Sequence, residues 1–258
     1  MKDYKLYLID LDGTIYTGNT PIKHSKKFVE YLEESNLDYL FITNNSTKTA
    51  SQVVAKLESM GITTSEEHIY TSALAASEYA HKKNYKNIHV IGEQGLREAL
   101  EDNNLNLVGH SDADAVIIGL DRKLTYDKLS DASLALQRGI PFIATNPDKL
   151  LPTENGMTPS NGGQVKFLEY ATSREAVVIG KPSTIIMELA IEKFGYKKEE
   201  IVMVGDNYDT DIMSGINIGI DTIHVQTGVT SKEEVLSKEK QPTYTFENLN
   251  EFLENKGV

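Results

Sequence analysis

Eight short, largely apolar runs recur along the chain, and most are followed directly by Gly, Asp or Thr. Runs of this length are typical of strands that are buried on both faces of a sheet. Helical stretches lie between them, clearest at residues 49–60 and 183–194, and each of these is followed by a glycine that can end a helix. The alternation predicts an α/β fold with a mainly parallel sheet. The runs lie at residues 6–9, 39–42, 88–91, 115–118, 141–144, 176–179, 201–204 and 222–225.

Composition excludes several classes of function. The 258 residues carry a formal net charge of −12 and no basic stripe, which opposes a nucleic-acid partner. The chain has no cysteine, which excludes disulfides, thiolate metal sites and a cysteine nucleophile. No apolar stretch approaches the roughly 18 residues of a membrane span, and the first residues do not form a signal-peptide core. We therefore expect a cytoplasmic protein with no membrane partner.

Polar motifs follow four of the apolar runs, at the strand ends where parallel sheets bind ligands. Each motif has a plain alternative when taken alone. The first can be a turn, the second and fourth can be helix caps, and the third can be a loop with a solvated lysine. The motifs are Asp10-Leu11-Asp12-Gly13-Thr14, Thr43-Asn44-Asn45, Gly180-Lys181-Pro182, and Gly205-Asp206 followed by Asn207, Asp209 and Asp211.

Taken together, the motifs predict a phosphoryl-transfer site, because one sheet would bring all four to the same edge. Asp10 and Asp206 supply carboxylate oxygens, and the backbone carbonyl of Asp12 can add another, a ligand set that suits Mg²⁺. The metal would offset the repulsion between an anionic nucleophile and an anionic phosphate. Phosphoryl oxygens would be held by the Thr43 hydroxyl, the Asn44 backbone N–H and the Lys181 ammonium.

This set of motifs resembles the haloacid dehalogenase superfamily over almost the whole chain. The resemblance implies that Asp10 is a nucleophile forming an aspartyl-phosphate, and that Asp12 protonates the leaving group and then activates water. It also implies that Asp206 binds Mg²⁺, while Asp211 and Asn207 support the site. A second aspartate favours phosphate esters over carbon–halogen bonds, since an alkoxide leaving group needs a proton and a halide does not.

The spacing of the motifs locates a second domain. Only 31 positions separate Asp12 from Thr43, whereas 138 separate Thr43 from Lys181, far more than one crossover needs. We expect an inserted α/β cap domain at residues 78–175 and a Rossmann-like, doubly wound core at residues 1–77 and 176–258. A cap at this place, of type C2, resembles subfamily IIA, the NagD-like and p-nitrophenyl phosphatase-like group.

Within the expected cap, the segment Thr145-Asn146-Pro147-Asp148 closes an apolar run. It resembles a segment of that subfamily that faces the active site, which makes Asn146 and Asp148 candidate substrate-binding residues. A strand-to-turn junction explains the same residues, because Asn-Pro-Asp is favourable turn chemistry. The six histidines show no metal-ligand spacing, and we interpret them as surface or packing residues.

The sequence thus predicts a Mg²⁺-dependent phosphomonoester hydrolase. The subfamily resemblance implies small phosphorylated substrates such as sugar or sugar-acid phosphates, with p-nitrophenyl phosphate as a substrate in vitro. Two alternatives stay open: phosphotransfer to a small acceptor other than water, and a non-catalytic sensor of a phosphorylated metabolite. A homo-oligomer also stays open, because both domains offer faces for an interface.

Overall fold

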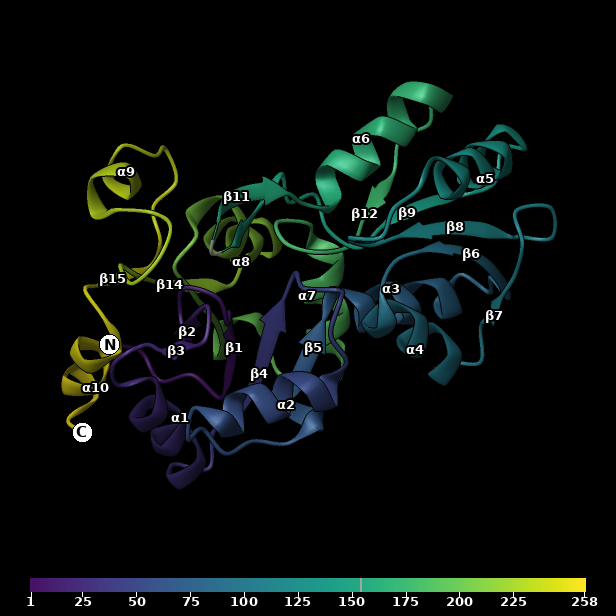
Figure 1. Ribbon diagram of the computed structural model, residues 1–258. Coiled ribbons are helices and arrows are strands. Elements are labelled where there is room, and N and C mark those ends of the chain that lie inside the picture. The colour runs from purple at the N-terminus through teal and green to yellow at the C-terminus, as the bar shows by residue number, and fades with distance from the viewer. Residues whose placement is uncertain (154) are drawn as a thin grey trace. The chain divides into compact units, whose positions relative to one another are not determined.

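The computed structural model describes residues 1–153 and 155–258, which divide into two compact units. Each unit is a parallel sheet covered by helices (Figure 1). Among the described residues, no helix is long and apolar enough to cross a membrane. Unit 1 comprises Met1–Thr43, Ser51–Tyr70 and Lys181–Val258, and unit 2 comprises Asn44–Ala50 and Thr71–Gly180.

The sheet of unit 1 has six strands in the order β15-β14-β13-β1-β4-β5. The pairs of β1 with β4 and β13, and of β14 with β13 and β15, are parallel. The chain runs outward from β1 to β5 and then returns to build the other half from β13, so the strand order reverses between β1 and β13. The strands are β1 (Leu6–Ile9), β4 (Asp38–Thr43), β5 (Ile69–Thr71), β13 (Ile201–Gly205), β14 (Asp221–Val225) and β15 (Tyr244–Phe246).

Helices cover both faces of this sheet because the two halves wind in opposite directions. In Figure 1, α1 and α2 lie on one side and α7 and α8 on the other. Ser183 caps the N-terminus of α7, and its side chain accepts a hydrogen bond from the Ile185 N–H. The helices are α1 (Ser25–Glu34), α2 (Ala50–Ser59), α7 (Thr184–Glu192), α8 (Met213–Ile218), α9 (Lys232–Leu236) and α10 (Leu249–Lys256), with short helical turns at Glu66–His68, Lys198–Glu200 and Tyr208–Ile212 and a hairpin of β2 (Tyr16–Thr17) and β3 (Thr20–Pro21).

Unit 2 has a five-stranded parallel sheet in the order β12-β9-β8-β6-β7. Helices α3 and α4 lie below the sheet and α5 and α6 above it in Figure 1. Ile118, Leu136 and Leu168 belong to the core between the sheet and α5 and α6. The elements are α3 (Ser72–Lys82), β6 (Asn87–Ile91), α4 (Gln94–Asp102), β7 (Asn106–Leu107), β8 (Ala115–Ile118), α5 (Tyr126–Gln137), β9 (Phe142–Ala144), a hairpin of β10 (Leu150–Thr153) and β11 (Gly156–Pro159), α6 (Asn161–Thr172) and β12 (Val177–Val178).

The predicted α/β class, all eight strands and both helices are confirmed, although β6 and β12 are only partly buried. The two compact units also differ from the predicted domain boundaries. A boundary between residues 77 and 78 would cut α3, and one between 175 and 176 would separate β12 from its partner β9. Residues 44–50 also belong to unit 2, because they pack with it. Helix and sheet pairing set these boundaries, and the spacing of motifs does not reveal them.

Candidate active site

Asp10 and Asp206 lie at the point where the strand order of unit 1 reverses. They directly follow β1 and β13, which are neighbours in parallel register, and the Asp10 N–H donates to the Val204 carbonyl at 2.9 Å. Both side chains are buried, as is that of Asp211 in the next turn. Carboxylate oxygens of these three residues lie within 4.8 Å of one another. The reversal of a parallel sheet is where such folds bind ligands.

Lys181 joins this cluster from the loop before α7 and is only 1% exposed. Its Nζ lies 2.6 Å from Asp10 Oδ1 and 2.8 Å from Asp211 Oδ1, and it donates to the Ile42 carbonyl at 2.9 Å. Burial by itself would lower the pKa of this ammonium, but the two carboxylates raise it above its usual value. Lys181 is therefore a permanent cation between two of the three carboxylates.

The carboxylates remain in excess over this ammonium. Burial raises the pKa of Asp10 well above its usual value, and the Asp211 carboxylate raises it further, against the opposing effect of Lys181. The same two causes, burial and Asp211, raise the pKa of Asp206 to about 6. Carboxylates that destabilise one another in a buried place are stabilised by another cation. Oxygen ligands from Asp10 and Asp206 suit Mg²⁺, so the donor set fits the metal predicted from the sequence.

Asp206 is held by two residues of the first motif and by the loop after β14, which none of the four motifs includes. The Thr14 hydroxyl donates to Oδ1 at 3.0 Å, and the Val229 N–H donates to Oδ2 at 2.7 Å. Gly13 and Gly228 pack so closely on the carboxylate that a Cβ on either glycine would overlap it. The Thr227 hydroxyl donates to the Gly13 carbonyl at 2.6 Å, which ties the loop after β14 to the loop after β1. A Thr-Gly pair one residue after a buried strand was the one signal in the sequence for this loop.

His224 in β14 is buried, and its Nε2 lies 3.1 Å from the Asp206 backbone carbonyl. Burial lowers the pKa of the imidazole, so the ring is neutral at pH 7 and Nε2 donates this hydrogen bond. The interpretation of His224 as a packing residue is consistent with its burial, but the ring also fixes the backbone of a proposed metal ligand.

Asp12 lies in the turn after β1, and its side chain is exposed. The turn closes through the Gly13 N–H, which donates to the Tyr16 carbonyl at 2.7 Å, and Gly13 has a φ of 97° that favours glycine. Tyr16 is buried beside it, and burial together with the Asp12 carboxylate raises the pKa of the phenol. The phenol thus stays protonated and hydrogen-bonds to Asp12. The predicted general acid is oriented by a neighbour that the motif does not name.

Asn207 forms the N-terminal cap of the turn at Tyr208–Ile212. Its side chain accepts from the Asp209 N–H at 3.0 Å, and its own N–H donates to Asp211 Oδ2 at 3.1 Å. The alternative in which Asp206 and Asp211 cap this turn is therefore wrong. The Asn207 N–H thereby holds the carboxylate that binds Lys181, and its supporting role in the site stays a prediction.

The other predicted residues fall in two units. Thr43 ends β4 and is buried in unit 1, whereas Asn44, Asn146 and Asp148 belong to unit 2. There the Asn146 side chain donates to the Asn44 carbonyl at 2.8 Å, and the Asn44 side chain donates to Asp148 Oδ1 at 3.0 Å. The structure thus brings together the second motif and the two candidate substrate-binding residues. The sequence had not predicted this contact.

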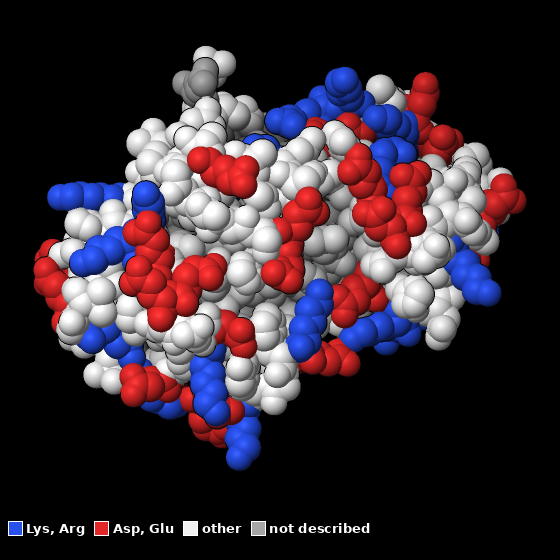
Figure 2. Space-filling model, turned by 90° about the horizontal axis from the view of Figure 1, so that it is seen from below, with Lys and Arg blue, Asp and Glu red and all other residues white. Residues whose placement is uncertain are grey.

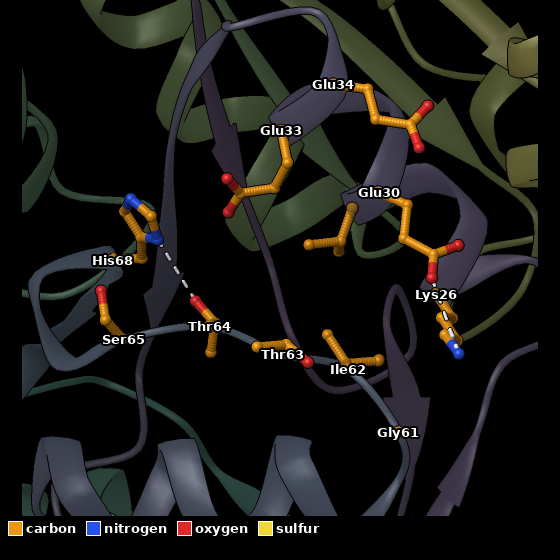
Figure 3. Close-up of a pocket in the computed structure, with 11 residues that line it drawn as sticks. Lys26, Glu30, Glu33, Glu34, Gly61, Ile62, Thr63, Thr64, Ser65 and His68 are labelled. Carbon is orange, nitrogen blue, oxygen red and sulfur yellow. Dashed lines mark hydrogen bonds and ion pairs between the residues drawn. The ribbon is translucent and has the colours of Figure 1, made fainter.

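A surface pocket of about 460 Å³ lies elsewhere in unit 1, between α1 and the segment 61–68 (Figure 3). Glu30, Glu33 and Glu34 line it beside Lys26 and His68. It is near the amino ends of β4 and β5, whereas the motifs follow carboxyl ends. Three carboxylates repel a phosphate group, so this pocket is not the substrate site.

The charged side chains on the face shown in Figure 2 are intermixed. The basic side chains, Lys and Arg together, occur in several small groups there, and no continuous basic band crosses the described residues of this face. Together with the net charge of −12, this distribution does not favour a polyanionic partner such as nucleic acid.

Comparisons with known proteins identify the family of this chain. A family model described as haloacid dehalogenase-like hydrolase matches residues 7–106, and a second, HAD-hydrolase-like model matches residues 178–252. The chain is 48% identical over 251 residues to an acid sugar phosphatase of Staphylococcus epidermidis, covering 97% of both chains. It is 47% identical over 254 residues to an acid sugar phosphatase of Staphylococcus saprophyticus, covering 98% of both.

Solved structures show the same relationship. A p-nitrophenyl phosphatase from Archaeoglobus fulgidus superposes with a TM-score of 0.93 at 34% identity, with 98% of this chain and 100% of that chain covered. A putative p-nitrophenyl phosphatase from Bacillus subtilis superposes with a TM-score of 0.90 at 43% identity, with 99% and 97% covered. The chain therefore belongs to the haloacid dehalogenase-like hydrolases, in the NagD-like branch that contains the p-nitrophenyl phosphatases.

Proposed function

We propose that this protein, a phosphatase by family, hydrolyses small phosphomonoesters, sugar phosphates among them, with Mg²⁺ and through a covalent intermediate on Asp10. The names of its relatives, acid sugar phosphatase and p-nitrophenyl phosphatase, support this substrate class. The observation that carries the proposal is the cluster of Asp10, Asp206 and Asp211 around the buried Lys181 ammonium.

The excess of negative charge in this cluster supports a divalent cation. Asp10 and Asp206, with the Asp12 carbonyl, are the residues that would hold Mg²⁺. When bound, the metal would offset the repulsion between the attacking carboxylate and the phosphate, and would stabilise the charge on the phosphoryl oxygens. Asp211 then serves mainly to position Lys181, which it binds at 2.8 Å.

The proposed first step is attack of an Asp10 carboxylate oxygen on phosphorus. The new P–O bond forms as the bond to the ester oxygen breaks, and Asp12 gives its proton to the departing alkoxide. Lys181 favours the ionised form of Asp10 and holds its carboxylate in place through the contact at 2.6 Å. The exposed position of the Asp12 side chain is compatible with a role at the leaving group.

The second step returns the enzyme to its starting state. Asp12, now a carboxylate, takes a proton from water, and the water oxygen attacks phosphorus and displaces the Asp10 carboxylate. Phosphate leaves, and Asp12 is protonated again. Thr43 and the Asn44 N–H are assigned to the phosphoryl oxygens on the strength of their motif, together with Lys181.

The substrate-selecting role of residues in unit 2 also belongs to this proposal. Such a role favours small metabolites over phosphoproteins as substrates. Phosphotransfer to another acceptor and non-catalytic sensing remain the alternatives. A protein that only binds a phosphorylated ligand does not need a nucleophile such as Asp10 and an acid such as Asp12 in one loop. Their presence therefore disfavours the sensor.

Phosphate release tests the proposal directly. The panel comprises sugar phosphates, sugar-acid phosphates, a nucleotide and p-nitrophenyl phosphate, each with Mg²⁺ or EDTA, for wild type and Asp10→Asn. We expect the wild type to release phosphate in the presence of Mg²⁺. We expect no release by the wild type in EDTA, and none by Asp10→Asn in either condition. Folded wild-type protein that releases no phosphate from any panel member would overturn the proposal, and transfer of the phosphoryl group to an added alcohol would favour the transferase.

A further inference from the structure

The inference concerns a group of polar side chains in unit 2, four neutral and one a carboxylate, which we call the Asn44 network. Its members come from four separate places in the chain, and apart from Asn44 and Asp148 their side chains are almost fully buried. They are Asn44, Ser72, Asn146, Asp148 and Asn161.

Three of these side chains hold Asn44. The Ser72 hydroxyl and the Asn146 amide both donate to the Asn44 backbone carbonyl, at 2.6 and 2.8 Å. The Asn44 amide donates to Asp148 Oδ1 at 3.0 Å. Backbone and side chain of Asn44 are thus fixed together, by three bonds from residues 28 or more positions away.

The segment 145–148 is itself fixed from two sides. The Asn161 amide donates to the Asn146 carbonyl at 2.9 Å, and the Gly162 N–H donates to the Asp148 carbonyl at 2.8 Å. The Asp148 N–H donates to Asn146 Oδ1 at 3.2 Å, which closes the turn between them. The hydrogen-bonding capacity of Asn146 and Asp148 is therefore directed largely into the protein.

The network also reaches the third motif. The Gly180 N–H donates to the Thr145 carbonyl at 2.8 Å. A Cβ at Gly180 would meet the Asn44 side chain, the Thr145 carbonyl and Asn146 Cβ, so only glycine fits there without a shift. Asn44 directly follows Thr43, and Gly180 directly precedes Lys181. Two motifs that are 136 positions apart are therefore in contact inside unit 2 at the residues next to their functional side chains.

We propose that Asn146 and Asp148 are positioning residues, which hold the Asn44 N–H and the start of the Gly180-Lys181 segment for the phosphate, rather than residues that select the organic part of the substrate. This inference rests on the proposed function, because it assigns the second and third motifs to the phosphoryl group. It predicts that their loss affects every phosphate ligand alike, including one with no organic part.

The test compares four variants with the wild type. Asn146→Ala and Asp148→Ala remove bonds to Asn44, whereas Asp148→Asn keeps an oxygen that can accept from the Asn44 amide. Asn103→Ala is the control, because its amide also makes a hydrogen bond inside unit 2, to the Ser77 hydroxyl at 2.8 Å, outside the network. The readouts are thermal unfolding, kcat and KM for a sugar phosphate and for p-nitrophenyl phosphate, and the binding of inorganic phosphate in the presence of Mg²⁺.

Asn146→Ala and Asp148→Ala should weaken inorganic phosphate binding about tenfold, the scale of one lost hydrogen bond to a charged group. Their kcat/KM should fall by a similar factor for both esters. Asp148→Asn and Asn103→Ala should stay within about twofold of wild type. If Asn146→Ala does not fold, Asp148→Ala carries the test, since Asp148 is only partly buried.

Different failures are distinguishable. Unchanged phosphate binding in Asp148→Ala, with a loss confined to one ester, would overturn the inference and make Asp148 a substrate-selecting residue. An equal loss in Asp148→Asn would show that the carboxylate charge itself is needed, which also overturns it. Wild-type protein that binds inorganic phosphate but hydrolyses no ester would overturn the proposed function while leaving the phosphate-binding test intact. A wild type that does neither would overturn both.

Discussion

Both units place an aspartate and a lysine beyond the carboxyl end of a central strand, and the two pairs have different chemistry. In unit 1, Asp10 follows β1 and binds Lys181 at 2.6 Å. In unit 2, Asp121 lies shortly after β8 and binds Lys128 at 2.6 Å. Both carboxylates are buried, but Lys181 is almost fully enclosed while the side chain of Lys128 is 38% exposed.

The surroundings of the two pairs explain the difference. Asp121 has one lysine and a backbone N–H donor from Lys123 at 2.8 Å, so its charge and lone pairs are largely satisfied by the protein. Asp10 shares Lys181 with Asp211, and Asp206 adds a third carboxylate nearby. A candidate site is therefore marked by uncompensated buried charge, and a buried ion pair by itself marks only structure.

The largest expected effect comes from the two aspartates. Asp10→Asn removes the proposed nucleophile and should lower kcat by about 10⁴-fold or more, while Asp121→Asn should leave kcat within about twofold. Phosphate release with Mg²⁺ measures both, and mass spectrometry of the acid-quenched enzyme measures the aspartyl-phosphate. Turnover retained in Asp10→Asn would end the covalent mechanism, and an equal loss in Asp121→Asn would remove the contrast between the pairs.

Asp12→Ala tests the proposed general acid. Its kcat should fall by about 10²–10⁴-fold for a sugar phosphate, because an alkoxide leaving group needs a proton. The loss should be smaller for p-nitrophenyl phosphate, since p-nitrophenolate leaves without one. If the variant loses the same factor in kcat for both esters, Asp12 has a structural role instead.

Gly228→Ala tests whether packing on Asp206 prepares the metal site. A methyl group there would overlap the Asp206 carboxylate, and the carboxylate must shift. We expect the Mg²⁺ concentration for half-maximal activity to rise about tenfold, and Mg²⁺ to protect the variant less against thermal unfolding. Gly109→Ala is the matched control, because nothing lies within 4 Å of its added Cβ. Equal Mg²⁺ responses in both variants would contradict the role of Gly228.

The smallest effect on activity is expected for Lys128→Met. Its loss leaves the buried Asp121 carboxylate with fewer donors, which should destabilise the protein by about 1–3 kcal/mol. Thermal unfolding should shift downward, while kcat and the Mg²⁺ requirement stay unchanged. A fall in kcat at a temperature where the variant is fully folded would show that this pair also takes part in the reaction.

Much of the fold and of the site was predictable from sequence. The eight apolar runs became strands because continuous burial on both faces leaves few other structures open to them. Asp10 and Asp206 came together because β1 and β13 are parallel neighbours that end at one edge. Lys181 follows β12, a strand of the other sheet, so the prediction that one sheet carries all four motifs is wrong for the third motif. The short strands β5, β7 and β15 were not predicted, since two or three residues carry too little periodicity.

The remaining features depend on contacts between distant residues, which leave no local pattern. The loop at Thr227–Thr230 contacts Asp206 only because β14 lies beside β13. Asn44 belongs to unit 2 because Ser72, Asn146 and Asp148 bind it. Local sequence specifies which residues are apolar, where strands end and which chemical groups follow them. Only the packed chain specifies which neighbour each group finds, because hydrogen bonds across 100 positions depend on the register of whole sheets.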